Sequence, residues 1–297
     1  MTYPNLFSLV GNTPLVKLNS IFAQPGITVY AKLEGQNPGG SVKDRAAYNM
    51  IRSALDRGEI NEQTTLIEAT SGNTGIALAM MARQFNIPIE LVMPENSTQE
   101  RVDTMRAYGA TVTLTPAKET IEGSIRYVEE KLKQPGYFNL NQFGNKDNYL
   151  AHYKTTGPEI WKDTEGKVTH FVSAMGTTGT IMGTSMYLKE QSQSVQIVGA
   201  QPSDGSSIPG IRKWSPEYLP KIFDANRVDK VIEVSEAEAT QMARRLAKEE
   251  GIFAGMSSGG AVAVAEKLVA TLTEPSTIVC IICDRGDRYL SSDLFRE

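Results

Sequence analysis

A lysine stands at the start of a predicted helix, where a positive charge is unfavourable. Residues 37–58 read NPGGSVKDRAAYNMIRSALDRG, and apolar side chains recur along one helical face of this segment. Ser41 and Asp44 have the spacing of a capping box, which predicts Ser41 as the N-cap and Asp44 as the N3 residue. Lys43 then lies in the first turn, where the helix dipole disfavours a cation by ~0.3–1 kcal/mol. Two explanations are open: a solvated lysine at a helix start, or an amine whose chemistry requires it to lose a proton.

Two glycine-rich turns could each bind an anion. The segments EATSGNTGIALA (68–79) and SAMGTTGTIMG (173–183) both pass from a strand pattern through small residues into a helix pattern. Backbone N–H groups at such a helix start lack intrahelical acceptors and bind anions. Hydroxyl groups add further donors: Thr70, Ser71 and Thr74 in the first turn, and Thr177, Thr178 and Thr180 in the second. Either turn alone is as well explained by an ordinary capped connection, but the pair predicts a ligand with two anionic groups.

A phosphate site, a carboxylate site and a reactive lysine together indicate pyridoxal 5′-phosphate (PLP) acting on an amino acid. The helix dipole alone is too weak to keep the Lys43 amine unprotonated, so burial, a neighbouring cation or a permanent Schiff base must contribute. Nucleotide motifs fit less well. The turn MGTTGT (175–180) departs from G-x-G-x-x-G, and in GQNPGGSVK (35–43) two residues separate Gly40 from the lysine that a P-loop places directly after it. A kinase or ATPase is therefore the runner-up class.

Alternating strand and helix patterns supply the scaffold for these residues. Strand patterns lie at 27–34, 64–70, 88–94, 110–116, 169–175, 194–202 and 276–283, and helix patterns at 42–57, 72–86, 98–109, 118–133, 176–191, 235–251 and 258–272. The helix at 235–251 opens with a second capping-box pattern, Ser235 with Glu238. The β-α order predicts parallel sheets covered by helices. We therefore expect an α/β protein with two open twisted sheets flanked by helices, and ligands at the carboxyl ends of the strands.

Composition and charge restrict the partners. The 297 residues carry 30 Lys and Arg against 34 Asp and Glu, a net charge of −4, and no Lys/Arg block marks a nucleic-acid surface. The longest apolar runs, 76–82 and 278–283, are far shorter than the ~18 residues that a membrane span needs. The N-terminus has no signal-peptide pattern. We therefore expect a cytoplasmic protein with small-molecule substrates and neither a nucleic-acid nor a membrane partner.

The cysteines and histidines predict no metal site. Cys280 and Cys283 lie three residues apart in a strand pattern, so their side chains should point to opposite faces of a sheet. No second cysteine pair is present to complete a zinc site. His152 and His170 have no partner at metal-ligand spacing.

Seven motifs, including the lysine segment and the two glycine-rich turns, run in order along nearly the whole chain: GNTPLVKL (11–18), KLEGQNPGGSVKDRAA (32–47), EATSGNTGIALA (68–79), NQFGNKDN (141–148), TTGPEIW (155–161), GTTGT (176–180) and SSGGAVA (257–263). With them, the sequence resembles the O-acetylserine sulfhydrylase (cysteine synthase) family of fold type II PLP enzymes. Segments 205–220, 250–260 and 281–295 resemble the B branch of that family rather than the A branch. The resemblance implies a tryptophan synthase β-like fold and a homodimer. The expected domains are a larger PLP-binding domain (1–37 and 149–297) and a smaller mobile domain (38–148) that carries the substrate-carboxylate loop.

The resemblance also implies a role for each matching residue. Lys43 would form the Schiff base and act as the general base, and Asn73 would hydrogen-bond the 3′ oxygen of PLP. The phosphate would bind to Gly176, Thr177, Thr178, Gly179 and Thr180, and the substrate carboxylate to Thr70, Ser71, Gly72, Thr74 and Gln142. Ser257 is expected to face the pyridine nitrogen, with Asp284 as the alternative, and Cys283 is expected to flank the ring.

The reaction that the resemblance implies is a β-replacement. L-Cysteine would form from O-acetyl-L-serine and sulfide through an α-aminoacrylate intermediate, with thiosulfate as an alternative sulfur donor that gives S-sulfocysteine. Other candidates are O-phosphoserine or serine as the substrate, as in a cystathionine β-synthase, a serine/threonine dehydratase, and a catalytically silent PLP-fold binding protein. One departure concerns the co-substrate, because this chain has Arg212 and Lys213 where the B branch commonly has two arginines. Arg212 would still bind a larger anion, whereas Lys213 keeps the charge but loses the bidentate geometry.

Overall fold

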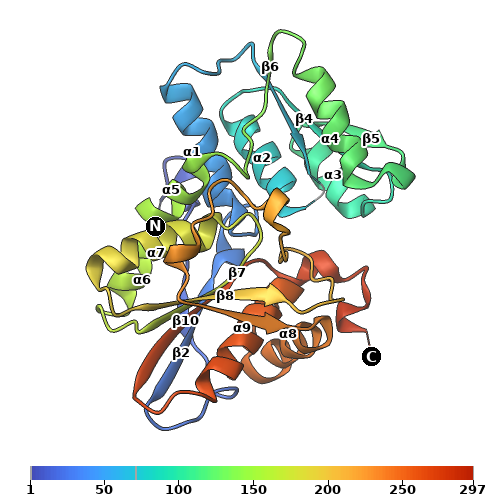
Figure 1. Cartoon of the computed structure of the whole chain (residues 1–297). Helices are drawn as coiled ribbons and strands as arrows, with labels where there is room; N and C mark the ends of the chain where they lie inside the picture. Colours follow the sequence, from blue (N-terminus) through green and yellow to red (C-terminus); the bar gives the residue numbers. More distant parts are fainter. Residues whose placement is uncertain (1, 71, 297) are drawn as a thin grey trace.

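The strands form two separate sheets (Figure 1). The computed structural model describes residues 2–70 and 72–296. The first sheet has the order β1-β2-β10-β7-β8-β9, with β1 (Leu15–Lys17), β2 (Ile27–Leu33), β7 (His170–Ala174), β8 (Gln196–Pro202), β9 (Lys230–Val234) and β10 (Ser276–Ile282). The second has the order β5-β4-β3-β6, with β3 (Thr65–Ala69), β4 (Ile89–Pro94), β5 (Thr111–Thr115) and β6 (Tyr137–Phe138). All pairs are parallel except β1 with β2. The parts built on the six-stranded and four-stranded sheets are called the larger lobe and the smaller lobe below.

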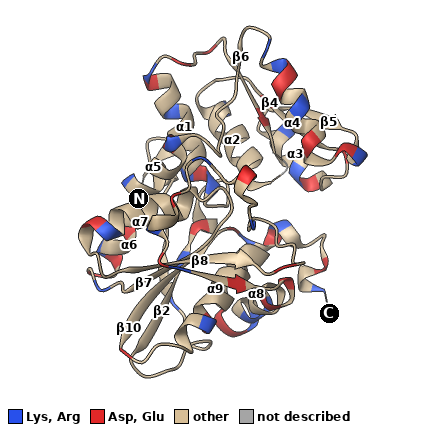
Figure 2. Cartoon of the chain, in the orientation of Figure 1, with Lys and Arg blue, Asp and Glu red and all other residues tan. Residues whose placement is uncertain are grey.

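Helices cover both sheets. The smaller lobe holds α1 (Lys43–Asp56), α2 (Asn73–Gln84), α3 (Gln99–Ala107) and α4 (Thr120–Lys131), and the larger lobe holds α6 (Thr156–Asp163), α7 (Gly179–Gln191), α8 (Glu236–Glu250) and α9 (Met256–Val269). Between them, α5 (Lys146–Lys154) packs on both α1 and α7. Figure 2 shows basic and acidic residues interleaved on the outer helices, with neither sign dominating the view.

Within the described residues, no helix combines the length and apolarity needed to cross a membrane.

Apolar clusters cover both faces of the six-stranded sheet, which explains why its central strands are almost continuously hydrophobic. One cluster joins the sheet to α8 and α9 and includes Ala239 and Val262. The cluster on the other face joins it to α6 and α7 and includes Ile160 and Ile181. A separate core in the smaller lobe combines side chains of α1, α2 and β4. The body of α1 is therefore buried in the smaller lobe.

The predicted α/β class with two open sheets is confirmed. All seven predicted strands form, but β1, β6, β9 and α5 were not predicted. The capping box predicted for α8 is present, since Ser235 Oγ accepts from the Glu238 N–H and the Glu238 carboxylate accepts from the Ser235 N–H. The domain limits at 37/38 and 148/149 stay a prediction.

The capping box predicted at Ser41 and Asp44 is wrong. The N-cap of α1 is Val42, and Ser41 Oγ accepts from the Lys43 N–H (3.2 Å) rather than from Asp44. The Asp44 carboxylate instead accepts from the N–H of Gly39 (2.5 Å). The cause is a tertiary contact. Ser41 forms an isolated β-bridge with Asp284, and the Val42 N–H donates to the carbonyl of Cys283. The backbone before α1 is thus attached to the larger lobe.

A close helix crossing in the larger lobe gives a test of this packing. A Cβ atom at Gly259 of α9 would lie 2.1 Å from the carbonyl oxygen of Ala239 on α8, and backbone cannot move aside cheaply. We therefore expect Gly259→Ala to lower the free energy of unfolding by ~1–3 kcal/mol in urea denaturation. Glu129→Ala, at an exposed position of α4, is the control and should change it by less than ~0.5 kcal/mol. Equal stability of the two variants would contradict the close crossing.

Candidate active site

Lys43 begins α1 at the junction of the two lobes. The backbone just before it is fixed, because the Val42 N–H donates to the carbonyl of Cys283 (2.8 Å), at the end of β10. Burial raises the pKa of the Cys283 thiol to about 11, and the charge of Lys43 opposes that rise. Burial lowers the pKa of His152 to about 3, with Arg45 and Lys43 adding to the effect. Lys43 therefore lies close enough to Cys283 and His152 for its charge to act on both.

The turn at 176–180 connects β7 to α7 and has the features of an anion site. Thr178 adopts a left-handed backbone conformation (φ 71°), and its Oγ1 is buried without a hydrogen-bond partner among the described residues. The first N–H groups of α7 have no intrahelical acceptor. A Cβ at Gly179 would lie 2.1 Å from Asn148 Oδ1, so this position requires glycine. An orphaned hydroxyl beside free N–H groups fits a phosphate, which is the group predicted here from the sequence.

Three residues that the motif analysis did not single out surround this turn. Asn148 Nδ2 donates to Thr177 Oγ1 (3.1 Å), and Trp214 Nε1 donates to the carbonyl of Gly176 (2.8 Å). His152 contacts Thr180 Oγ1 through Nε2 (3.3 Å). Asn148 closes the NQFGNKDN motif, so that motif was the available signal for it. His152 had no sequence signal, because its partners lie on other helices.

The predicted carboxylate-binding residues meet at the start of α2. Thr74 Oγ1 donates to Gln142 Oε1 (2.9 Å). The side-chain N–H groups of Gln142 do not take part in this hydrogen bond and could donate to a substrate carboxylate. The carbonyl of Gln142 accepts from Asn148 Nδ2 (2.7 Å). Thr70 is buried beside them at the end of β3, and a Cβ at Gly72 would have no neighbour within 4 Å. Ser71 lies outside the described residues. Asn148 therefore joins the carboxylate segment to the phosphate turn.

Asn73 is held by two charged residues of the C-terminal segment. Its Nδ2 donates to Asp284 Oδ2 (2.7 Å), and its Oδ1 accepts from the guanidinium of Arg288. Tyr289 also donates to Asp284 Oδ2 (2.7 Å). The second oxygen of Asp284 faces Gly255, since a Cβ built there would lie 2.3 Å from it. Asn73 and Tyr289 thus both bind Oδ2 of Asp284, whereas its Oδ1 is buried without a hydrogen-bond partner among the described residues.

Ser257, the preferred candidate for the pyridine nitrogen, lies in the first turn of α9 and is 3% exposed. It lies close enough to Cys283 to lower the pKa of that thiol, against the effect of burial. A Cβ at Gly210 would lie 3.4 Å from Ser257 Oγ, and one at Gly176 would lie 2.7 Å from the carbonyl oxygen of Gly210. Ser257 is therefore linked to both Cys283 and the phosphate turn. The choice between Ser257 and Asp284 stays a prediction.

Arg212 and Lys213 differ in their surroundings. The Arg212 N–H donates to the carbonyl of Met175 (2.9 Å), directly before the phosphate turn, and its guanidinium lies over the Trp214 ring (5.4 Å to the centroid). Lys213 Nζ is paired with the carboxylates of Asp204 (2.7 Å) and Glu233 (2.8 Å). Lys213 therefore keeps its charge, but two carboxylates are already paired with it, and a role toward an anionic co-substrate stays a prediction.

The cysteine pair behaves as predicted. Cys280 belongs to the cluster under α8 and α9, whereas Cys283 packs on the cluster of the opposite sheet face. Both are free thiols. No group of His, Cys, Asp and Glu that could hold a metal ion is found among the described residues.

Comparison with known proteins gives the class to which this arrangement belongs. Residues 6–284 match the family described as pyridoxal-phosphate dependent enzymes, and the chain belongs to that family. The predicted fold type and cofactor are confirmed.

Within this family, the chain is similar to cysteine synthases. It is 57% identical over 294 residues to cysteine synthase B of Pseudomonas aeruginosa, covering 99% of this chain and 98% of that protein. It is 54% identical over 288 residues to cysteine synthase B of Escherichia coli, covering 97% and 95%. The solved structure of a cysteine synthase from Entamoeba histolytica matches with a TM-score of 0.95 at 37% identity, covering 100% of this chain and 92% of that one. The predicted resemblance to the B branch is confirmed.

The buried side chain of Glu68 lies next to the segment that is predicted to bind the substrate carboxylate. Glu68 lies on β3, two residues before Thr70, and is 7% exposed. It accepts from Asn139 Nδ2 (3.2 Å) and from the N–H of Asn141, directly before Gln142. Burial raises the pKa of Glu68 from its ordinary 4.5 to about 8, and the two hydrogen bonds only partly oppose the rise.

This pKa predicts a pH-dependent stability. The folded protein holds the Glu68 proton more tightly than the unfolded chain, so the stabilisation is complete below pH 4.5 and is lost as pH rises toward 8. Glu68→Gln keeps an acceptor but cannot ionise. Its free energy of unfolding, measured in urea at a series of pH values, should therefore rise relative to wild type across this interval. Glu62→Gln, at an exposed position, is the control, and a Glu68→Gln difference that stays constant with pH would contradict the buried carboxyl.

Proposed function

We propose that this protein catalyses PLP-dependent β-replacement, forming L-cysteine and acetate from O-acetyl-L-serine and sulfide. The observation that carries the proposal is the Asn148 amide, which joins the carboxylate segment to the phosphate turn beside Lys43. A ligand with a phosphate at one end and an amino-acid carboxylate at the other matches this spacing of two anion sites. The similarity to cysteine synthases over nearly the whole chain supports the same reaction.

The site residues fit PLP and its substrate as follows. The N–H groups and hydroxyls of 176–180 would hold the phosphate, Lys43 the aldehyde carbon, Asn73 the 3′ oxygen and Ser257 the pyridine nitrogen, with Cys283 beside the ring. When bound, the cofactor supplies an electron sink that acidifies the Cα proton of the amino acid and permits loss of its β-substituent.

The remaining work falls to side chains of this protein. Thr70, Ser71, Gly72, Thr74 and Gln142 would bind the substrate carboxylate and so orient the Cα–H bond toward Lys43. Lys43 removes that proton as general base and returns it to Cα after the sulfur nucleophile has added to Cβ. The backbone of Gly72, directly before α2 and without close neighbours, would allow the segment to close over the substrate and exclude water, whereas Gly75 is packed inside α2 against Met105.

Borohydride trapping and a lysine variant test the central assignment. The purified protein should show a visible absorption band that borohydride bleaches, leaving a pyridoxyl group on the peptide that contains Lys43. Lys43→Ala should lose measurable cysteine formation, because one residue serves as both carrier and base. Lys133→Ala, on an exposed lysine of the smaller lobe, is the control and should keep wild-type activity. A colourless wild-type protein, or an active Lys43→Ala, would contradict the assignment.

The sulfur donor can be tested at Arg212. Its guanidinium lies over the ring of Trp214, which itself contacts Gly176 of the phosphate turn, and has no carboxylate partner among the described ion pairs. We therefore expect Arg212 to bind the larger anion thiosulfate in addition to sulfide. Arg212→Ala should raise the KM for thiosulfate about tenfold, the loss of roughly one charge-assisted hydrogen bond, and leave that for sulfide nearly unchanged. Lys213→Met is the matched control, since its ammonium is already paired. An equal rise for both donors in Arg212→Ala would show that Arg212 does not select the anion.

Product analysis separates the other candidates. O-Phosphoserine or serine as substrate gives the same L-cysteine but releases phosphate or water instead of acetate. Homocysteine as nucleophile gives cystathionine, and dehydration gives a keto acid and ammonia. A homodimer and a cytoplasmic location are further expectations, to be checked by size-exclusion chromatography and cell fractionation.

A further inference from the structure

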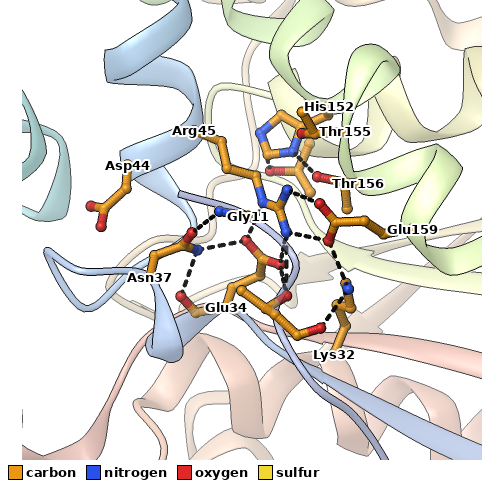
Figure 3. A network of polar contacts seen from close by, with 12 residues as sticks. Gly11, Lys32, Glu34, Asn37, Asp44, Arg45, His152, Thr155, Thr156 and Glu159 are labelled. Atoms are coloured by element: carbon orange, nitrogen blue, oxygen red, sulfur yellow. Dashed lines mark hydrogen bonds and ion pairs between the residues drawn. The ribbon is translucent and has the colours of Figure 1, made fainter. Parts of the chain in front are cut away.

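A buried set of charged side chains lies beneath the first turn of α1 (Figure 3). It consists of Lys32 on β2, Glu34 on the 3-10 helix that follows β2, Arg45 on α1 and Glu159 on α6, and is called the Arg45 network below. Lys32 and Glu34 are fully buried, and Arg45 is 2% exposed. Side chains of β2, of the 3-10 helix after it and of the distant helix α6 therefore meet at one arginine of α1.

Arg45 forms a double pair with each of two carboxylates. Its Nε and Nη2 donate to Glu34 (2.7 and 2.8 Å), and its Nη1 and Nη2 donate to Glu159 (both 2.7 Å). Lys32 Nζ adds a contact to Glu159 Oε2 (2.8 Å). Burial would raise the pKa of Glu34, but the charge and hydrogen bonds of Arg45 outweigh it and lower the pKa to about 2. The pairs therefore stay charged at neutral pH.

Side-chain contacts continue from this network to the phosphate turn. Glu159 shares α6 with Thr156, whose Oγ1 contacts His152 Nδ1 (2.8 Å). His152 Nε2 in turn contacts Thr180 Oγ1 (3.3 Å) in the turn at 176–180. Figure 3 shows His152 and Thr156 directly beside the Arg45–Glu159 pair. The helix of Lys43 is thus connected to the turn that would hold the cofactor phosphate through the Arg45–Glu159 pair, the backbone of α6 and two polar contacts of His152.

Stability alone does not explain a charged network at this place. A buried ion pair contributes little net stability, because an apolar set of similar volume is often at least as stable. The rest of α1 packs in the opposite direction, since Ala47, Met50 and Ile51 belong to the core of the smaller lobe. Without the network, the first turn of α1 would have fewer attachments to the larger lobe, which holds the phosphate turn.

We propose that Arg45 is a positioning residue for Lys43, fixing the first turn of α1 to the larger lobe so that Lys43 Nζ stays in register with the phosphate turn. The inference rests on the proposed function. The step it serves is the addition of Lys43 Nζ to the aldehyde carbon of PLP, in which a C=N bond forms and one water molecule leaves. Pyridoxamine 5′-phosphate carries an amine in place of the aldehyde, so it can occupy the site without bonding to Lys43. The two ligands therefore separate the position of Lys43 from the integrity of the site.

Arg45→Lys is the test variant, with Arg57→Lys as matched control. R45K keeps a positive charge between Glu34 and Glu159 but loses the planar paired hydrogen bonds. Arg57 caps the other end of α1 and is likewise paired with two carboxylates, those of Glu59 (2.9 Å) and Asp147 (2.8 Å). For each apoprotein, we would measure the Kd of pyridoxamine 5′-phosphate and the rate at which PLP produces the visible band.

The two ligands should respond differently in R45K. Its Kd for pyridoxamine 5′-phosphate should stay near the wild-type value, whereas the band should form about tenfold more slowly, because small displacements of reacting groups cost large factors in rate. R57K should match wild type in both measurements. Unchanged band formation in R45K, or parallel loss of both ligands, would overturn the positioning role.

If R45K does not fold, Glu159→Gln is the substitute, because it leaves the Arg45–Glu34 pair in place. It should show the same difference between the two ligands, and equal behaviour of the two ligands in this variant would overturn the proposal. A wild-type protein that forms no band with PLP would instead refute the proposed function itself, and is distinguishable because it involves no substitution.

Discussion

Helix α1 packs against both lobes, and the position of Lys43 depends on these two sets of contacts. The body of α1 is buried in the core of the smaller lobe, yet its first turn must face a turn of the larger lobe. Main-chain contacts to Cys283 and Asp284 attach the residues before α1, and the Arg45 network attaches the residues just after Lys43. Lys43 is therefore held from both sides, while its own side chain is left for chemistry.

The same logic applies to the two anion sites. Each is a strand–turn–helix connection whose free N–H groups are fixed by the local backbone, but their separation is set by contacts between elements. Asn148 on α5 contacts both the carbonyl of Gln142 and the hydroxyl of Thr177. Because α5 packs on both α1 and α7, one small amide can define the distance between a carboxylate site and a phosphate site. The glycine at 179 is required by that contact as much as by the ligand.

Features fixed by neighbouring residues were predictable from sequence, and features fixed by distant ones were not. The turns at 68–79 and 173–183 and the capping box at Ser235 depend on local backbone chemistry, and they were placed correctly. The capping box predicted at Ser41 does not form, because the backbone of Ser41 pairs with that of Asp284, more than 200 residues away. β9 was missed because KVIEV is an edge strand in which two of five residues are charged. The ion pairs of Lys213 were not predicted, because its partners Asp204 and Glu233 are brought to it only by the fold.

The buried titratable groups fall into two sets, those that keep one charge state near neutral pH and those that change it. Glu34, with a pKa lowered to about 2, and His152, with a pKa lowered to about 3, keep one charge state near neutral pH, and both belong to the contacts between α1 and the phosphate turn. Burial instead raises the pKa of Asp44 to about 7 and that of Glu68 to about 8. Asp44 is turned away from the Arg45 network (Figure 3) and accepts from the N–H of Gly39. Glu68 lies under the carboxylate segment and accepts from Asn139. Changes of pH near neutrality therefore act on Asp44 in the first turn of α1 and on Glu68 under the carboxylate segment, while the charges of the Arg45 network stay constant.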